Sequence, residues 1–189
     1  MKSALNLFRF AMNRRHVIST LSLAPFAHAR PNRAGVRKKF IGVWKLVSGE
    51  SKDEVTGEVR YPWGTKPVGR LAYDDAGHVF AQLMNPGRRP VGGLADRGAA
   101  AAIATLSADD MREMLTGFNA YFGTFDVDEP AQTVIHHLQS ALIPSWVGTD
   151  QRRKYEFSGS NQLIMFNTAS HAAYRLVWQR DDKRAPQDA

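Results

Sequence analysis

The amino-acid sequence predicts an all-β fold, a single antiparallel up-and-down β-barrel of eight to ten strands with a short helical insertion. Three observations carry this prediction. Apolar and polar residues alternate with a period of two along nine segments between Phe40 and Arg180. Most breaks between these segments carry turn residues, and the short connections favour antiparallel neighbours because a parallel crossover needs a dozen or more residues. A meander of many short strands favours closure, which removes exposed sheet edges.

Length and composition agree with one globular domain. The chain has 189 residues, with 43% hydrophobic, 23% charged and 10% aromatic residues. This length is too short for two ordinary domains and long enough for one sizeable core. The chain has no cysteine. Disulfides, thiolate metal sites and cysteine nucleophiles are therefore excluded.

The predicted strands follow one another with turn signals between most of them. We expect strands at Phe40–Ser48, Val55–Pro62, Val68–Asp74, His78–Met84, Ala120–Val127, Thr133–Ile143, Asp150–Phe157, Asn161–Thr168 and Ala172–Arg180. The turn signals are Thr56-Gly57, Asp74-Asp75-Ala76-Gly77, Asp128-Glu129-Pro130 and Ser158-Gly159-Ser160-Asn161.

A helical insertion interrupts the strands between Met84 and Ala120. The run Asn85–Pro90 is predicted as a loop, and the Ala-rich run Ala95–Ala104 as a short helix. Ser107-Ala108-Asp109-Asp110 resembles a capping box, which predicts a second helix ending at Gly117. We expect this second helix to bury one face against the barrel, with the apolar residues Met111, Met114 and Leu115.

The first 40 residues read as an export signal and a leader. Arg14 and Arg15 precede a short apolar stretch, and Ala27-His28-Ala29 has the A-x-A form of a cleavage site. The arginine pair resembles a twin-arginine signal. We therefore predict a signal peptide over residues 1–29, with Met12 as a possible true start, and export to the periplasm or outside the cell. Residues 30–39 are predicted as a disordered basic leader, 40–180 as the barrel, and 181–189 as a disordered tail. A generic secretory signal and a disordered basic tail remain as alternatives.

The formal net charge of +7 does not indicate a nucleic-acid partner. Nine of the 25 Lys and Arg residues, but none of the 18 acidic residues, lie in residues 1–39. Residues 40–189 therefore carry 16 basic against 18 acidic side chains. Binding through phosphate contacts needs basic residues clustered on the folded domain. The sequence also contains no apolar stretch long enough to span a membrane.

Two neighbouring histidines are the most reactive groups of the predicted barrel. Adjacent residues of a strand point to opposite faces, so His136 and His137 cannot bind one metal ion together. If His136 faces inward, Val134 and Leu138 lie beside it. An inward histidine is either a hydrogen-bonded core residue or a general acid–base catalyst, since its charge can change near neutral pH.

Arg153 shares a strand face with Tyr155 and Phe157. A buried arginine is costly unless it meets a carboxylate, so an inward Arg153 is paired with an acid or placed for an anionic head group. An outward orientation is equally consistent with the spacing. Several aromatic residues are candidates for the barrel lining or for plain core, namely Trp44, Tyr73, Phe80, Tyr121, Phe125, Trp146 and Trp178.

Several motifs resemble the bacterial lipocalin-like domain family. Gly42-Val43-Trp44 has the Gly-x-Trp form that starts lipocalin barrels. In that family the tryptophan closes the barrel floor beneath an arginine, a role that Arg175 or Arg180 would fill. The similarity runs over about residues 40–180 and is carried by Gly42–Ser48, Tyr61–Gly64, Gly69–Tyr73, Gly77–Met84, Ala120–Phe125, Thr133–Leu138, Pro144–Arg153 and Arg175–Trp178.

The resemblance implies a lipocalin-like barrel and leaves the activity open, because fold alone does not decide function. The leading hypothesis is binding of a small hydrophobic or amphipathic molecule, without a cofactor or metal. One alternative is an isomerase or cyclase that uses His136 as base. Another is a filled barrel that acts through its surface. The oligomeric state is left open. The candidate ligand-binding residues are Tyr73, Gln82, Tyr121, His136, Arg153, Tyr155 and Trp178.

Overall fold

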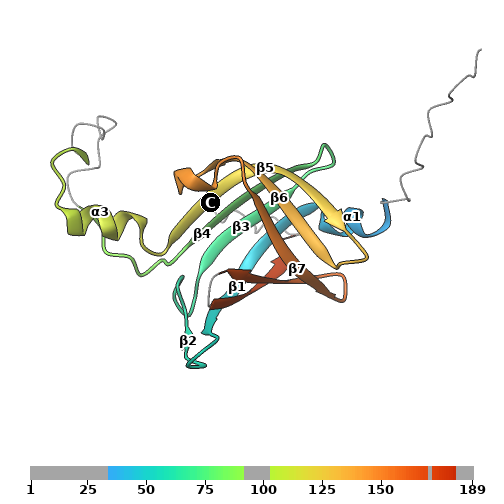
Figure 1. Ribbon diagram of the computed structural model, residues 1–189, viewed down its shortest axis with the longest axis horizontal. Coiled ribbons are helices and arrows are strands. Elements are labelled where there is room, and N and C mark those ends of the chain that lie inside the picture. Colours follow the sequence, from blue (N-terminus) through green and yellow to red (C-terminus); the bar gives the residue numbers. More distant parts are fainter. Residues whose placement is uncertain (1–33, 92–102, 170–171, 182–189) are drawn as a thin grey trace, which may run out of the picture. The chain divides into compact units, whose positions relative to one another are not determined.

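The computed structural model describes residues 34–91, 103–169 and 172–181. The predicted signal peptide, residues 30–33, most of the Ala-rich helix and the tail from residue 182 lie outside the described residues. Figure 1 shows the order of the elements along the chain. Their bounds are α1 Ala34–Phe40, β1 Gly42–Asp53, β2 Val59–Arg60, β3 Val68–Tyr73, β4 His78–Met84, α3 Ala108–Leu115, β5 Phe118–Asp128, β6 Thr133–Ala141, η1 Pro144–Trp146, β7 Asp150–Ser158, β8 Gln162–Ala169 and β9 Ala172–Arg180.

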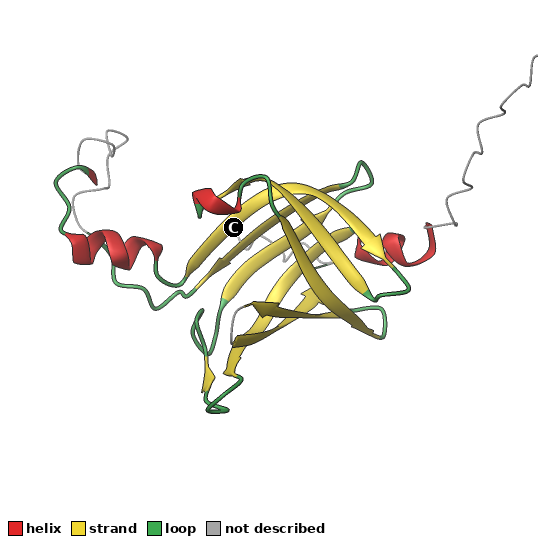
Figure 2. Cartoon of the chain, viewed as in Figure 1, coloured by secondary structure: helices red, strands yellow, loops and turns green. Residues whose placement is uncertain are grey.

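The described strands form a closed antiparallel barrel (Figure 2). Strands β1 and β3 to β9 pair in chain order, and β9 returns to pair with β1 along most of its length. The short strand β2 adds to β1 alone. The predicted all-β barrel is confirmed, with eight strands in the closed ring.

Turn chemistry places the hairpins where the sequence predicts them. Gly57, Gly77 and Gly159 have positive φ values of 73°, 98° and 63° in the turns after β1, β3 and β7. Glycine adopts this region without steric cost, so these positions end one strand and begin the next. The predicted strand Val55–Pro62 is reduced to β2, because Asp53 Oδ1 accepts hydrogen bonds from the backbone of Val55 and Thr56.

Two irregularities bend the sheet. The pairing of β1 with β9 shifts between Leu46 and Ser48, so the inward face passes from Trp44 and Leu46 to Gly49 and Ser51. The pairing of β5 with β6 shifts between Phe122 and Gly123. β-bulges of this kind increase the local twist and help a sheet to close.

Helix α1 corrects one prediction. Residues 34–39 form a helix and not a disordered leader. The helix ends in Phe40, which is fully buried at one end of the barrel (Figure 1). Its ring lies 5.0 Å from those of Tyr155 and Phe157 and 5.3 Å from that of Tyr73. This aromatic cluster fills the barrel at what we call the closed end.

Hydrogen bonds to carbonyl groups at the end of α1 hold this segment against the barrel. Arg180 donates to the carbonyl oxygens of Lys39 at 2.7 Å and Ile41 at 2.8 Å. The indole Nε1–H of Trp44 donates to the carbonyl oxygen of Phe40 at 2.8 Å. A cation at a helix C-terminus also interacts favourably with the helix dipole.

The Gly-x-Trp motif, Gly42-Val43-Trp44, contacts the same arginine, Arg180. The guanidinium of Arg180 lies 4.2 Å from the centre of the Trp44 ring, which confirms the expected stacking and assigns it to Arg180. Arg175 instead faces Glu50 at 3.7 Å. Gly42 has a φ of 125°, and a Cβ there would lie 2.8 Å from Nη1 of Arg180. Glycine therefore lets the chain pass close to this arginine.

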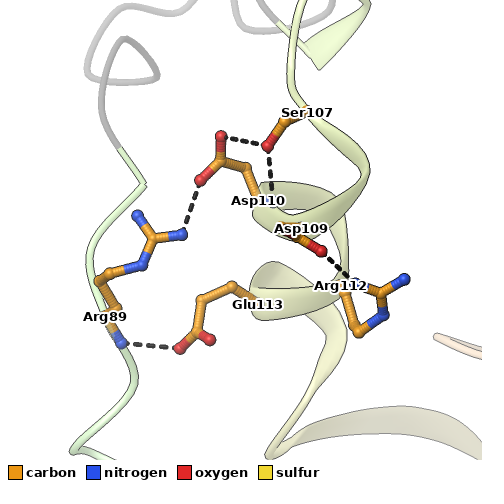
Figure 3. A network of polar contacts seen from close by, with 6 residues as sticks. All are labelled: Arg89, Ser107, Asp109, Asp110, Arg112 and Glu113. Atoms are coloured by element: carbon orange, nitrogen blue, oxygen red, sulfur yellow. Dashed lines mark hydrogen bonds and ion pairs between the residues drawn. The ribbon is translucent and has the colours of Figure 1, made fainter.

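Helix α3 begins as predicted, with Ser107 as its N-cap, but it buries none of its residues. Met111 and Leu115 are exposed, so the expected packing of this face against the barrel is wrong. Polar contacts hold the helix instead, as Figure 3 shows. Arg89 binds Asp110 at 2.6 Å and its backbone N–H donates to Glu113 at 2.8 Å. None of the described helices is long and apolar enough to cross a membrane.

Candidate functional site

A cavity of about 560 Å³ occupies the half of the barrel opposite helix α1. It lies where β4 ends, β5 begins and η1 follows β6. Its walls combine apolar and aromatic side chains with a few polar ones: Pro62, Trp63, Leu71, Leu83, Gly117, Phe118, Asn119, Tyr121, Ile143, Trp146, Gln151, Arg153, Met165, Asn167, Tyr174, Leu176 and Trp178. Volume and lining are typical of sites for small molecules.

His136 lies between this cavity and the aromatic cluster. It is fully buried, between Val134 and Leu138 as expected for an inward residue of β6. Its Nε2 lies 2.8 Å from the hydroxyl of Tyr73, and its Nδ1 lies 3.0 Å from the hydroxyl of Tyr121. Both ring nitrogens are therefore engaged inside the barrel, and His136 is not among the residues that line the cavity.

The contact with Arg153 indicates which ring nitrogen of His136 carries the proton. Nη1 of Arg153 lies 3.3 Å from Nδ1 of His136. A guanidinium only donates hydrogen bonds, so Nδ1 must be the acceptor. The proton of the neutral imidazole then sits on Nε2 and is donated to Tyr73. The hydroxyl of Tyr121 is the second donor at the same Nδ1, so Tyr121 and Arg153 share its single lone pair.

Burial sets the protonation states of this network. It lowers the pKa of His136 well below its usual value, and the charges of Arg153 and His137 act in the same direction. Burial also raises the pKa of Tyr73 and that of Tyr121. At neutral pH His136 is thus an uncharged imidazole between two protonated phenols.

Arg153 joins the network to the cavity. The residue is 7% exposed and faces inward from β7. Its Nη1 donates to the carbonyl oxygen of Gln151 at 3.2 Å, and its guanidinium lies 5.5 Å from the centre of the Tyr121 ring. Across the described ranges no carboxylate forms an ion pair with Arg153, so the acid partner considered from the sequence is not found there.

His137 faces the outside of the barrel, as the alternation predicts. Its Nδ1 lies 2.6 Å from Asp150, and its Nε2 lies 3.3 Å from Asp126. The hydrogen bond to Asp150 raises its pKa, and Asp126 adds to this effect. In the described part of the chain, no three His, Asp or Glu side chains gather as they would around a metal ion.

The structure divides the candidate residues into three groups. Tyr121, Arg153 and Trp178 line the cavity. His136 and Tyr73 lie behind it, while Tyr155 belongs to the closed end beside Phe40. The assignment of Gln82 to the interior is wrong, because its neighbours Ala81 and Leu83 are the buried residues of β4 and Gln82 is exposed.

Phe80 points outward like Gln82 and is 50% exposed, stacked on Phe122. Trp44 and Phe125 belong to the packed closed end rather than to the cavity. Trp146 does line the cavity, from η1.

Sequence reasoning missed residues that lie at the ends of strands and in the loops of the open end. Trp63, between β2 and β3, and Tyr174 from β9 lie with ring centres 6.0 Å apart at the cavity. Phe118 and Asn119 open β5 and also line it. Clustering of aromatic residues at the strand ends of one side was the available signal.

Comparisons with solved structures find barrels of low similarity. A redesigned β-barrel is 11% identical to this chain and superposes with a TM-score of 0.38. The alignment covers 77% of this chain and 94% of the chain of the redesigned barrel. A de novo designed fluorescence-activating β-barrel is 9% identical over 76% of this chain and 95% of its own, with a TM-score of 0.38. A mutant of the fluorescent protein UnaG is 11% identical over 78% of this chain and 99% of its own, with a TM-score of 0.36.

A search among curated proteins finds no match. The comparison with protein families does find one, the lipocalin-like domain, over residues 41–181. These residues include every strand of the closed barrel, the network around His136 and the cavity. The matched segment begins just before the Gly-x-Trp motif and ends just after Arg180, so it also contains both partners of that stacking. The chain belongs to the lipocalin-like domain family.

Proposed function

We propose that the protein binds a small, largely apolar molecule inside the open half of its barrel. The cavity of about 560 Å³ carries this proposal. Eight-stranded barrels have room either for packed side chains or for one small ligand. Here the closed end is packed with aromatic rings and the open half is not, which argues against the alternative of a barrel filled throughout.

The lining supports an amphipathic ligand. Most of the wall is apolar, with Leu71, Leu83 and Leu176 among its aliphatic members. Asn119, Gln151, Asn167 and Arg153 are among its few polar residues. Apolar walls give affinity by removing hydrocarbon surface from water, and isolated polar groups orient the ligand.

The contacts of His136 do not support the enzymatic alternative. A general base must reach the proton that it removes. Both nitrogens of His136 are bonded to protein groups, and Tyr121 and Arg153, but not His136, line the cavity. We therefore assign His136 to positioning Tyr121 and Arg153.

Binding is tested with the neutral apolar fluorophore N-phenyl-1-naphthylamine. We expect saturable fluorescence enhancement with one site per chain. The variant Leu176→Trp fills part of the cavity and should weaken binding by at least about tenfold, the effect of a 1.4 kcal/mol loss. Gln179→Trp is the matched control, because it adds the same side chain at an exposed position of the same strand. Equal binding by both variants would place the probe outside the cavity and contradict the proposal.

A further inference from the structure

The most unusual charge in the barrel is that of Arg153. A guanidinium carries five N–H donors. In the described part of the chain, Arg153 makes two hydrogen bonds, both through Nη1 and both to uncharged acceptors. The eight ion pairs among the described residues all involve other side chains. Arg153, a residue that is only 7% exposed, thus lies without an acidic partner there.

Such a charge is costly in a protein interior. Removing a guanidinium from water requires compensation by an opposite charge or by a full set of acceptors. Neutral His136 and the face of Tyr121 hold the group in place without neutralising it. Arg153 is also the one charged residue among those described as lining the cavity. A cavity with a single positive charge favours an anion and disfavours a cation.

Two further polar atoms of residues at the cavity lack hydrogen-bond partners among the described residues. The indole Nε1 of Trp178 and the amide Oδ1 of Asn119 are buried, without a hydrogen bond to any described residue. Both residues line the cavity, and Trp178 is 2% exposed. An indole N–H can only donate. It is therefore a buried donor without an acceptor among the described residues, on a side chain of the cavity wall.

We infer that the ligand of this cavity is an amphipathic monoanion, an apolar molecule whose carboxylate pairs with Arg153. The planar fork of a guanidinium matches the two oxygens of a carboxylate, which gives such pairs direction as well as strength. The aromatic residues Trp63, Phe118 and Trp146 then surround the apolar body. This inference rests on the proposed function and specifies the chemistry of its ligand.

The test compares two competitors that differ only in the head group. Decanoate and decan-1-ol displace bound N-phenyl-1-naphthylamine from the wild-type protein and from Arg153→Met. We expect the substitution to weaken the binding of decanoate by about ten- to a hundredfold, as for a lost hydrogen bond to a charged group. Its affinity for decan-1-ol should change less than twofold. The control is Arg152→Met, which removes an exposed arginine from the neighbouring position of the same strand.

An equal effect of Arg153→Met on both competitors, or no effect on decanoate, would overturn the inference. A failure of the proposed function is recognised separately, because the neutral fluorophore itself would then not bind in the cavity. The wild-type protein gives a second test that needs no variant. Decanoate should displace the fluorophore at least about tenfold more strongly than the decylammonium cation. Equal or stronger displacement by the cation would also overturn the inference.

Discussion

His136 is a buried residue whose charge state is coupled to folding. In the unfolded chain it titrates near the usual value of 6.5, whereas burial lowers its pKa in the folded protein. Between these two pKa values the unfolded chain binds a proton that the folded protein does not. Stability is therefore fully present above pH 6.5 and falls as the pH drops below it. His137 acts in the opposite direction, because its pKa is raised and its stabilising effect is lost as the pH rises through the folded pKa.

His136→Gln should reduce this sensitivity to acid. Glutamine keeps hydrogen-bonding ability but cannot titrate. Between pH 7.5 and pH 5.5 the wild-type free energy of unfolding should fall by about 1.4 kcal/mol in total through His136, most of it below pH 6.5. Urea unfolding at the two pH values measures the slope in both proteins. His137→Gln provides the control, since it leaves the contribution of His136 in place. The same acid slope in His136→Gln as in the wild type would contradict this account.

Helix α1 closes one end of the barrel, and Phe40 is its one fully buried side chain among the described residues. Phe40 is 0% exposed and contacts several aromatic rings, while Lys39 beside it is exposed. Its removal would leave a cavity in the packed half, because the surrounding strands are fixed by their hydrogen bonds.

Phe40→Ala should therefore lower the free energy of unfolding by about 3–5 kcal/mol. Lys39→Ala should change it by less than about 1 kcal/mol, because the exposed side chain loses only the contact of its Nζ with the Phe157 ring, 5.9 Å from the ring centre. Denaturant unfolding of the three proteins under one set of conditions measures both effects. If Phe40→Ala were as stable as Lys39→Ala, helix α1 would not be part of the cooperative fold.

Substitution of two glycines by alanine, one in β5 and one in α1, should change the free energy of unfolding in opposite directions. At Gly123, beside the irregularity between β5 and β6, a Cβ would lie 1.9 Å from the carbonyl oxygen of His137. Gly123→Ala therefore forces the two strands apart. At Gly35 in α1 nothing lies within 4 Å of such a Cβ. Alanine is favoured over glycine in a helix by about 1 kcal/mol.

We expect Gly123→Ala to cost about 2 kcal/mol or more, in the range of overpacked or strained sites, and to broaden the β5 and β6 resonances in NMR spectra. Gly35→Ala should raise stability by up to about 1 kcal/mol. Thermal unfolding monitored by circular dichroism compares the variants. If both substitutions or neither lowered the stability, the close approach of Gly123 to His137 would not account for the results.

At the scale of the domain, the described strands form a barrel with two different halves. The closed end is packed by Phe40, Trp44 and their neighbours, and the open end contains the cavity. Stability and binding are therefore served by different regions. This division explains why Arg153→Met should alter affinity while the fold remains, since no described carboxylate loses a partner.

We propose export as a property of the whole chain, on the residues Arg14, Arg15 and Ala27-His28-Ala29. Cleavage after Ala29 would give a mature protein beginning at Arg30. Mass spectrometry of the protein expressed with its leader should then find that N-terminus. Arg14→Lys combined with Arg15→Lys should block processing by a twin-arginine route and spare a general secretory route. An intact N-terminus at Met1 or Met12 in a cytosolic fraction would contradict export.

The sequence by itself determined the strands and the face on which most of their side chains lie. Period-two alternation follows from backbone geometry, so it showed that His136 and His137 diverge. The short connections between the strands showed that the barrel is antiparallel. The same rule would have excluded Gln82, which lies between the apolar residues Ala81 and Leu83. The Gly-x-Trp motif and its arginine were also readable, because that contact recurs within the family that the sequence resembles.

Only the tertiary structure decided at which level of the barrel each inward residue lies. Alternation separates inside from outside but carries no information on position along the barrel axis. Tyr155 and Arg153 share one face of β7, yet one packs against Phe40 and the other lines the cavity. Helix α1 was missed for a similar reason. Its basic sequence predicts disorder, and its order depends on Arg180, which is distant in the sequence and reaches its last carbonyl groups only when the barrel closes.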